Sequence, residues 1–225
     1  MTDQDLYKLI KAELFTAVVG DVLDKLGHQH QFLAPEIMPL DKRMRVVGRA
    51  MPVLEADVFS ANDDTPGRIG AKPFGLLFDA LDDIKPDEIY IATGSSLRYA
   101  LWGGLMSTRA IHLKAAGAVL DGFIRDANEI EALGFNVFCR GTYAQDQGPR
   151  GQVIDFRTSI EIEGIRITPG DLLFGDREGV LVIPRAVEQD VIDLALEKVR
   201  TENKVAEAIR AGMSACDAFQ KFGVM

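Results

Sequence analysis

Apolar residues recur at three- and four-residue spacing at both ends of the chain. Near the start this spacing predicts two helices, within residues 2–14 and 16–27, with Thr2 and Thr16 suited to cap them. Near the end it predicts a long amphipathic helix within residues 186–212. We therefore expect both ends of the chain to be helical.

Between these ends, short apolar runs alternate with turn-forming residues. Residues 44–58 predict a long strand with a break at Gly48, and residues 88–93 predict a short buried strand. A helix is expected over residues 73–81, because proline is favoured in the first turn. Residues 153–184 have a strand-and-turn pattern, which predicts a β-rich half laid against an earlier α/β half. With no internal repeat or low-complexity linker, one α/β domain is the simpler division.

The most informative stretch is residues 102–126. Gly103-Gly104 opens a run with helical spacing, and the free backbone N–H groups of such a helix start can bind an anion. An apolar segment follows and, after a predicted turn at Asp121-Gly122, the stretch ends on Arg125-Asp126. An Arg and an Asp beside a buried strand can serve as a carboxylate clamp and a metal ligand on one small molecule. The sequence therefore indicates a binding site here.

Charge and composition exclude several classes of function. A net charge of -9 and a pI near 4.9 argue against direct binding to nucleic acid or to an anionic membrane, since both need clustered Lys and Arg. The two cysteines lack metal-ligand spacing, and the charged start lacks the apolar core of a signal peptide. No run approaches the ~20 apolar residues of a membrane span. We expect a cytoplasmic protein.

Four segments together resemble the RraA-like family. They are AxxGGLM at 100–106, AGAVLDGFIRD at 116–126, GFNVF at 134–138 and PGDLLFGDREGVLVIP at 169–184. This family includes 4-hydroxy-4-methyl-2-oxoglutarate aldolases and regulators of ribonuclease E activity, and is often called dimethylmenaquinone methyltransferase-like. The resemblance covers nearly the whole chain. It implies a swivelling β/β/α sandwich in one domain, residues 1–225, that forms a homotrimer or hexamer with the helix near 186–212 in subunit contacts.

The resemblance also implies an activity, that of a divalent-metal-dependent lyase acting on a small 2-oxoacid. In the family's aldolases the pyruvate end of the substrate is held by the glycine turn and an Arg, and the adjacent Asp carries Mg²⁺ or Mn²⁺. Such an ion stabilises the pyruvate enolate that carbon–carbon cleavage produces. Carried over residue by residue, the anion turn is Gly103, Gly104, Leu105 and Met106, the clamp is Arg125, and the metal ligand is Asp126.

Position 104 departs from the family pattern. Many members carry Asp or Glu there, in contact with metal-bound water, whereas this chain has Gly104. A base for aldol cleavage is then missing, so both a 4-hydroxy-2-oxoacid aldolase and an oxaloacetate-type decarboxylase are open. Glu202 on the C-terminal helix is a candidate acid supplied across a subunit interface; its other interpretation is a solvated helix residue. The alternative function is a non-catalytic regulator of a ribonuclease, since the Arg125-Asp126 pair occurs in both branches.

Overall fold

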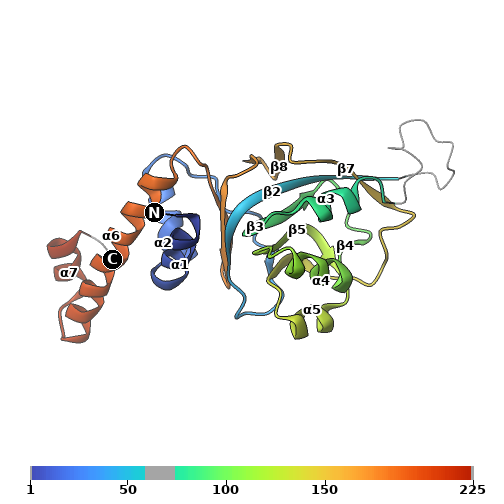
Figure 1. Ribbon diagram of the computed structural model, residues 1–225. Helices are drawn as coiled ribbons and strands as arrows, with labels where there is room; N and C mark the ends of the chain where they lie inside the picture. Colours follow the sequence, from blue (N-terminus) through green and yellow to red (C-terminus); the bar gives the residue numbers. More distant parts are fainter. Residues whose placement is uncertain (1, 59–73, 224–225) are drawn as a thin grey trace.

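A mixed sheet forms the centre of the fold in the computed structural model, which describes residues 2–58 and 74–223 (Figure 1). Within these ranges the sheet has nine strands in the order β1-β6-β5-β3-β2-β10-β11, with β4 paired to β5 and β7 paired to β2. The strands are β1 (Met38–Pro39), β2 (Val46–Asp57), β3 (Glu88–Thr93), β4 (Ala100–Trp102), β5 (Gly117–Ile124), β6 (Val137–Thr142), β7 (Gly151–Phe156), β10 (Leu172–Asp176) and β11 (Gly179–Ile183). A separate hairpin comprises β8 (Ile160–Ile162) and β9 (Ile165–Ile167).

Three short helices cover one face of the parallel part of this sheet. They are α3 (Leu77–Asp83), α4 (Gly104–His112) and α5 (Ala127–Leu133). Strands β2, β3, β5 and β6 pair in parallel, and their apolar side chains pack against these helices in one core cluster around Tyr90 and Trp102. Because β4 and β5 are also parallel, their carboxyl ends meet at one edge of the sheet, where ligands commonly bind in such folds.

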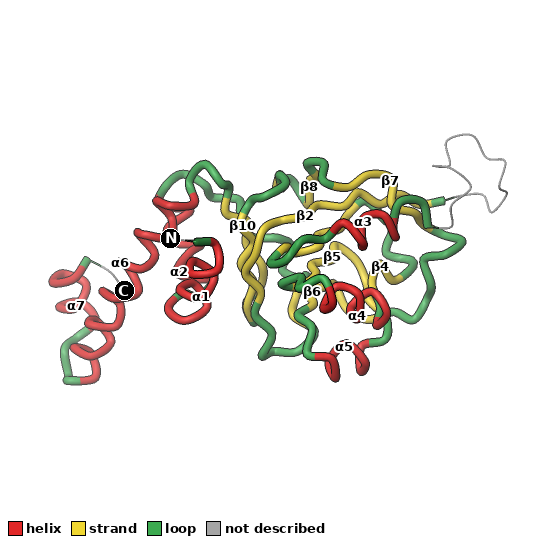
Figure 2. Tube along the Cα trace, in the orientation of Figure 1, coloured by secondary structure: helices red, strands yellow, loops and turns green. Residues whose placement is uncertain are grey.

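The remaining helices gather at the other end of the molecule (Figure 2). They are α1 (Asp3–Glu13), α2 (Thr16–Lys25), α6 (Glu188–Arg210) and α7 (Ala215–Phe222). Apolar faces of α1, α2 and α6 pack together and against β10 and β11 in a second core cluster. Of the helices in residues 2–58 and 74–223, none combines the length and the apolar character needed to cross a bilayer.

The helix starts illustrate what local sequence predicts and what it does not. Thr2 caps α1 with a full capping box, as expected. The prediction that Thr16 caps α2 is wrong, because Phe15 is the N-cap residue and Thr16 is the first helical residue. The carboxylate of Asp176, from β10, instead accepts hydrogen bonds from the Thr16 N–H at 2.9 Å and the Thr16 hydroxyl at 2.8 Å. A distant side chain therefore supplies the cap.

Strand predictions needed larger corrections. Strand β2 continues through Gly48 without a break, and glycine is required there because a Cβ would collide with the backbone oxygen of Asp87. The predicted turn at Asp121-Gly122 is also wrong, since β5 continues to Ile124 across a bulge. Strands β10 and β11 belong to the central sheet and not to a separate β-rich half. The predicted helix start at Pro73 lies outside the described residues, and α3 begins at Leu77.

Candidate active site

Helix α4 begins directly after β4, at the edge of the sheet where β5 ends. Gly103 is its N-cap residue, and the first bond within the helix joins the Ser107 N–H to the Gly103 oxygen at 3.1 Å. The N–H groups of Gly104, Leu105 and Met106 therefore have no acceptor inside the helix. This is the helix start that the sequence predicts, and the binding role of these amides stays a prediction.

Both glycines at this helix start lie beneath carboxylates. A Cβ on Gly103 would lie 2.8 Å from Oδ2 of Asp126, and a Cβ on Gly104 would collide with the carboxylate of Glu129 on α5. The backbone of Gly104 is not in the left-handed region. A side chain at this position would therefore be limited by the Glu129 carboxylate and not by backbone conformation. Position 104 thus adds no carboxylate to α4, while Glu129 places a carboxylate beside the same backbone position.

Asp126 connects the end of β5 to the start of α4. Its Oδ2 accepts a hydrogen bond from the Gly104 N–H at 3.0 Å, and its backbone is left-handed, with φ 59° and ψ 35°. A left-handed non-glycine residue is uncommon, although Asp tolerates this region better than most, and such residues concentrate at functional sites. Among the described residues, no hydrogen bond or ion pair is found at Oδ1. Asp126 therefore has a fixed carboxylate with one oxygen available.

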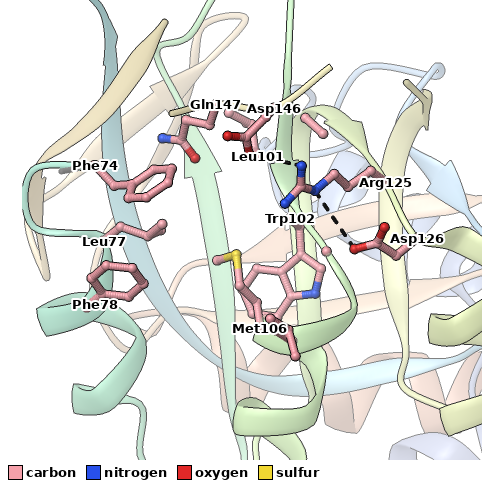
Figure 3. A pocket seen from close by; sticks show the side chains of 13 residues that line it. Phe74, Leu77, Phe78, Leu101, Trp102, Met106, Arg125, Asp126, Asp146 and Gln147 are labelled. Carbon is pink, nitrogen blue, oxygen red and sulfur yellow. Dashed lines mark ion pairs between the residues drawn. The ribbon is translucent and has the colours of Figure 1, made fainter. Parts of the chain in front are cut away.

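Arg125 lies between two carboxylates (Figure 3). Its Nη1 is 3.0 Å from Oδ1 of Asp146, and its Nε is 3.8 Å from Oδ2 of Asp126. Asp146 comes from the loop between β6 and β7. Within residues 2–58 and 74–223, Nη2 makes no hydrogen bond, so it can donate to a substrate carboxylate.

These groups line one end of a cavity of about 230 Å³. The same loop also contributes Gln147, and the opposite wall is apolar (Figure 3). The apolar wall includes Phe74, Leu77 and Phe78 around α3 and Met106 on α4. Among the residues that the structure describes, the cavity thus has a charged end, formed by Arg125 and the start of α4, and an uncharged end.

Sequence reasoning missed Glu55, a buried acid behind this cavity. Glu55 lies on β2 and is 2% exposed, and its Oε2 accepts a hydrogen bond of 2.6 Å from Nε2 of Gln147. Its Oε1 is buried with no partner among the described residues. Burial raises the pKa of Glu55 to about 8, although the Gln147 hydrogen bond opposes that rise. The only sequence signal was an acid between the apolar residues Leu54 and Ala56.

The structure does not bring Glu202 to this site within one chain. Glu202 lies on α6, at the opposite end of the molecule from α4 (Figure 1). Its Oε1 pairs with Nζ of Lys198 at 3.0 Å, and Lys198 also pairs with Asp21. Glu202 can therefore act here only from a neighbouring subunit, and that role stays a prediction.

The donor groups at Asp126 fit a hard divalent ion that keeps most of its water. Among residues 2–58 and 74–223, no group of three or more His, Cys, Asp or Glu side chains could hold a metal ion. A fixed carboxylate with one available oxygen matches Mg²⁺, which commonly binds proteins through one or two carboxylates and retains several waters. Such an ion would be held by Asp126 together with the substrate.

Comparison with known proteins agrees with the fold. The RraA-like family model, described as aldolase/RraA, matches residues 16–182. The chain belongs to the RraA-like family. The resemblance inferred from the sequence is thus confirmed.

The names of individual relatives indicate a broad class of function and no specific substrate for this chain. Over 88% of this chain it is 28% identical to protein DlpA of Legionella pneumophila, but it spans only 30% of that protein. It is 31% identical, over 91% of this chain and 89% of the relative, to a Halalkalibacterium halodurans protein named provisionally as a 4-hydroxy-4-methyl-2-oxoglutarate aldolase. These names indicate a family that includes lyases.

A solved relative confirms the fold class. The structure of Streptomyces coelicolor RraAS2, described as an unusual member of the RNase ES inhibitor RraA protein family, matches with a TM-score of 0.72. The match covers 84% of this chain and 90% of RraAS2 at 23% identity. The expected single α/β domain of the RraA-like type is therefore confirmed.

Proposed function

We propose that this protein is a divalent-metal-dependent lyase that releases pyruvate from a small 2-oxoacid. The observation that carries this proposal is the convergence of Arg125, Asp126 and the start of α4 at one end of a cavity. The aldolase name of the Halalkalibacterium halodurans relative supports the same class of reaction. The 2-oxoacid would be an aldol, a β-carboxylated acid such as oxaloacetate, or both.

The substrate carboxylate binds at the charged end of the cavity in this proposal. Nη2 of Arg125 donates to it, and the N–H groups of Leu105 and Met106 add two donors at the positive end of a helix. Asp146 holds the guanidinium from the side through Nη1. The substrate's ketone then lies towards Asp126, and the remainder of its chain extends along the apolar wall.

Asp126 would hold Mg²⁺ or Mn²⁺ beside the ketone. When bound, such an ion supplies positive charge that stabilises the enolate produced by bond cleavage. The Gly104 N–H fixes the Asp126 carboxylate through Oδ2, so its available oxygen keeps one direction. The apolar wall excludes water from the substrate, which strengthens the electrostatic interactions at the charged end.

Aldol cleavage also needs a group that accepts the hydroxyl proton. Glu129 is one candidate, because its carboxylate lies over Gly104 and makes no ion pair among the described residues. Glu202 of a neighbouring subunit is the other, and it requires the homotrimer or hexamer that the sequence predicts. The exposed side chain of Leu105 at the cavity rim suits such a contact between copies.

The alternative function is a non-catalytic regulator that binds a ribonuclease. The exposure of Leu105, 84% on the first turn of α4, favours some protein contact on this surface. A direct test separates the two functions. Purified protein is incubated with 4-hydroxy-2-oxoacids and with oxaloacetate, with and without Mg²⁺ or Mn²⁺, and pyruvate is measured. Metal-dependent release supports the lyase; a folded protein that releases none, but inhibits a ribonuclease, supports the regulator.

A further inference from the structure

Resting on the proposed function, we propose that the cavity selects 2-oxoacids whose far end is uncharged and apolar. Gln147, oriented by Glu55, accepts a hydrogen bond from a hydroxyl between the two ends of the substrate. The substrate class is then a 4-hydroxy-2-oxoacid with an alkyl or aryl end. A dicarboxylic acid such as oxaloacetate fits this cavity less well.

The first argument is the distribution of charge along the cavity. Among its described lining residues, Arg125 is the one that carries positive charge, and it lies at the end that receives the 2-oxoacid carboxylate. The other end is bounded by Phe74, Leu77 and Phe78. A second carboxylate placed there would lose water without gaining a cation from the described residues, and burying an unpaired charge is costly. An apolar group would lose water favourably.

The second argument is the fixed orientation of the Gln147 amide. Its Nε2 donates to the buried Glu55 at 2.6 Å, which directs the NH₂ group away from the cavity. The amide oxygen is then the atom that faces the cavity (Figure 3). Gln147 itself is 4% exposed, so its side chain has little freedom to rotate. The cavity wall thus offers an acceptor where a substrate hydroxyl can donate.

A matched pair of ligands tests the apolar end without any turnover. The ligands 2-oxopentanoate and 2-oxoglutarate have five carbons each and differ in whether the far end is a methyl group or a carboxylate. We expect 2-oxopentanoate to bind at least about tenfold more tightly in calorimetry with Mg²⁺ present. Equal binding, or tighter binding of 2-oxoglutarate, would overturn the inference.

Turnover then separates this inference from the proposed function. We expect pyruvate release from 4-hydroxy-2-oxopentanoate to exceed release from 4-hydroxy-4-methyl-2-oxoglutarate and from oxaloacetate. Release from the dicarboxylic acids at a higher kcat/KM overturns the inference and leaves the lyase standing. Pyruvate release from none of these substrates refutes the proposed lyase activity. The preference between 2-oxopentanoate and 2-oxoglutarate in calorimetry would still test whether the far end of the cavity favours an apolar group.

Phe78→Arg tests the apolar end of the cavity by replacing an apolar side chain with a positively charged one. Phe78 is 56% exposed at the rim, so this change places a cation beside the far end of the substrate with little risk to the fold. We expect the preference for 2-oxopentanoate over 2-oxoglutarate to shrink at least about tenfold, while Phe78→Leu keeps it. An unchanged preference in Phe78→Arg contradicts the proposed binding direction.

The hydrogen bond to Gln147 has its own variants. Gln147→Met keeps the length of the side chain but removes the acceptor. The Michaelis constant for the hydroxylated substrate, 4-hydroxy-2-oxopentanoate, should rise roughly three- to tenfold, while the inhibition constant for 2-oxopentanoate, which lacks the hydroxyl, stays constant. Glu55→Met should reproduce this selective loss by releasing the amide, and Glu55→Gln should rescue it because an acceptor remains. Equal effects on both ligands, or no rescue, would refute the positioning role of Glu55.

Discussion

Replacement of Glu55 by Gln should change how stability depends on pH. In the folded protein, burial raises the pKa of Glu55 from its ordinary value of 4.5 to about 8, with the Gln147 hydrogen bond acting in the opposite direction. Between these two pH values the folded protein keeps the proton and the unfolded chain releases it. The unfolded state therefore binds fewer protons, and the free energy of unfolding falls as pH rises. Glu55→Gln removes this dependence, because an amide does not titrate.

The size of the effect follows from the two pKa values. Each unit of difference corresponds to about 1.4 kcal/mol, so ionisation of Glu55 costs the folded state about 5 kcal/mol above pH 8 and about 3 kcal/mol at pH 7. Well below pH 4.5 the contribution vanishes, since both states are protonated. Relative to wild type, Glu55→Gln should thus gain stability as pH rises from 4.5 to 8 and gain no more beyond it.

Urea denaturation at pH 5, 7 and 9 measures this gain. At each pH, the free energy of unfolding of wild type is subtracted from that of Glu55→Gln, and the contributions of the other titrating groups cancel in this difference. The change of the difference with pH then reports the titration of Glu55. Glu161→Gln, an exposed glutamate on β8, controls for the loss of one acidic group. A difference that stays constant from pH 5 to pH 9 would show that Glu55 is ionised at neutral pH and refute the argument.

Three further predictions concern catalysis. Asp126→Ala should abolish metal-dependent pyruvate release while circular dichroism stays native, and full metal-dependent activity would end its assignment as ligand. Arg125→Lys should lose nearly as much kcat/KM as Arg125→Ala, because an ammonium cannot reproduce a planar, forked contact; activity equal to wild type would count against the clamp. Glu129→Ala should lower aldol cleavage relative to decarboxylation, by up to ~10²–10⁴-fold, and adding Gly104→Asp should restore it. An unchanged ratio in both variants would exclude Glu129 as the base.

Elements with a strong local signal were predictable from the sequence. Helix α5 ends at Leu133 because Gly134 adopts the left-handed conformation that glycine permits, and this stop is visible in the sequence. Strand β3 is a buried apolar run whose bounds, Glu88–Thr93, match the prediction. The helix start at Gly103-Gly104 is likewise a local feature, because it depends on residues next to each other in the chain.

Features set by distant partners were not predictable. Asp121-Gly122 is a typical turn dipeptide, yet the pairing of β5 with β6 keeps it extended. There Asp121 pairs with Nε of Arg140 at 2.7 Å and accepts a hydrogen bond from Thr93 at 2.6 Å. Glu55 and Gln147 are separated by 92 residues, so neither residue's neighbours indicate the bond between them. Tertiary contacts decide both cases.

Gly104 shows how a residue on another helix can bear on an inference made on sequence alone. Along the chain, the glycine removes a carboxylate from the start of α4 and weakens the case for aldol chemistry. In the fold, α5 packs beside α4, and the space that a side chain at position 104 would need is taken by the carboxylate of Glu129. A carboxylate there is favoured by the positive end of α4, whichever helix supplies it. If Glu129 has the proposed role of base, the charge in that space, and not the identity of residue 104, decides between aldolase and decarboxylase.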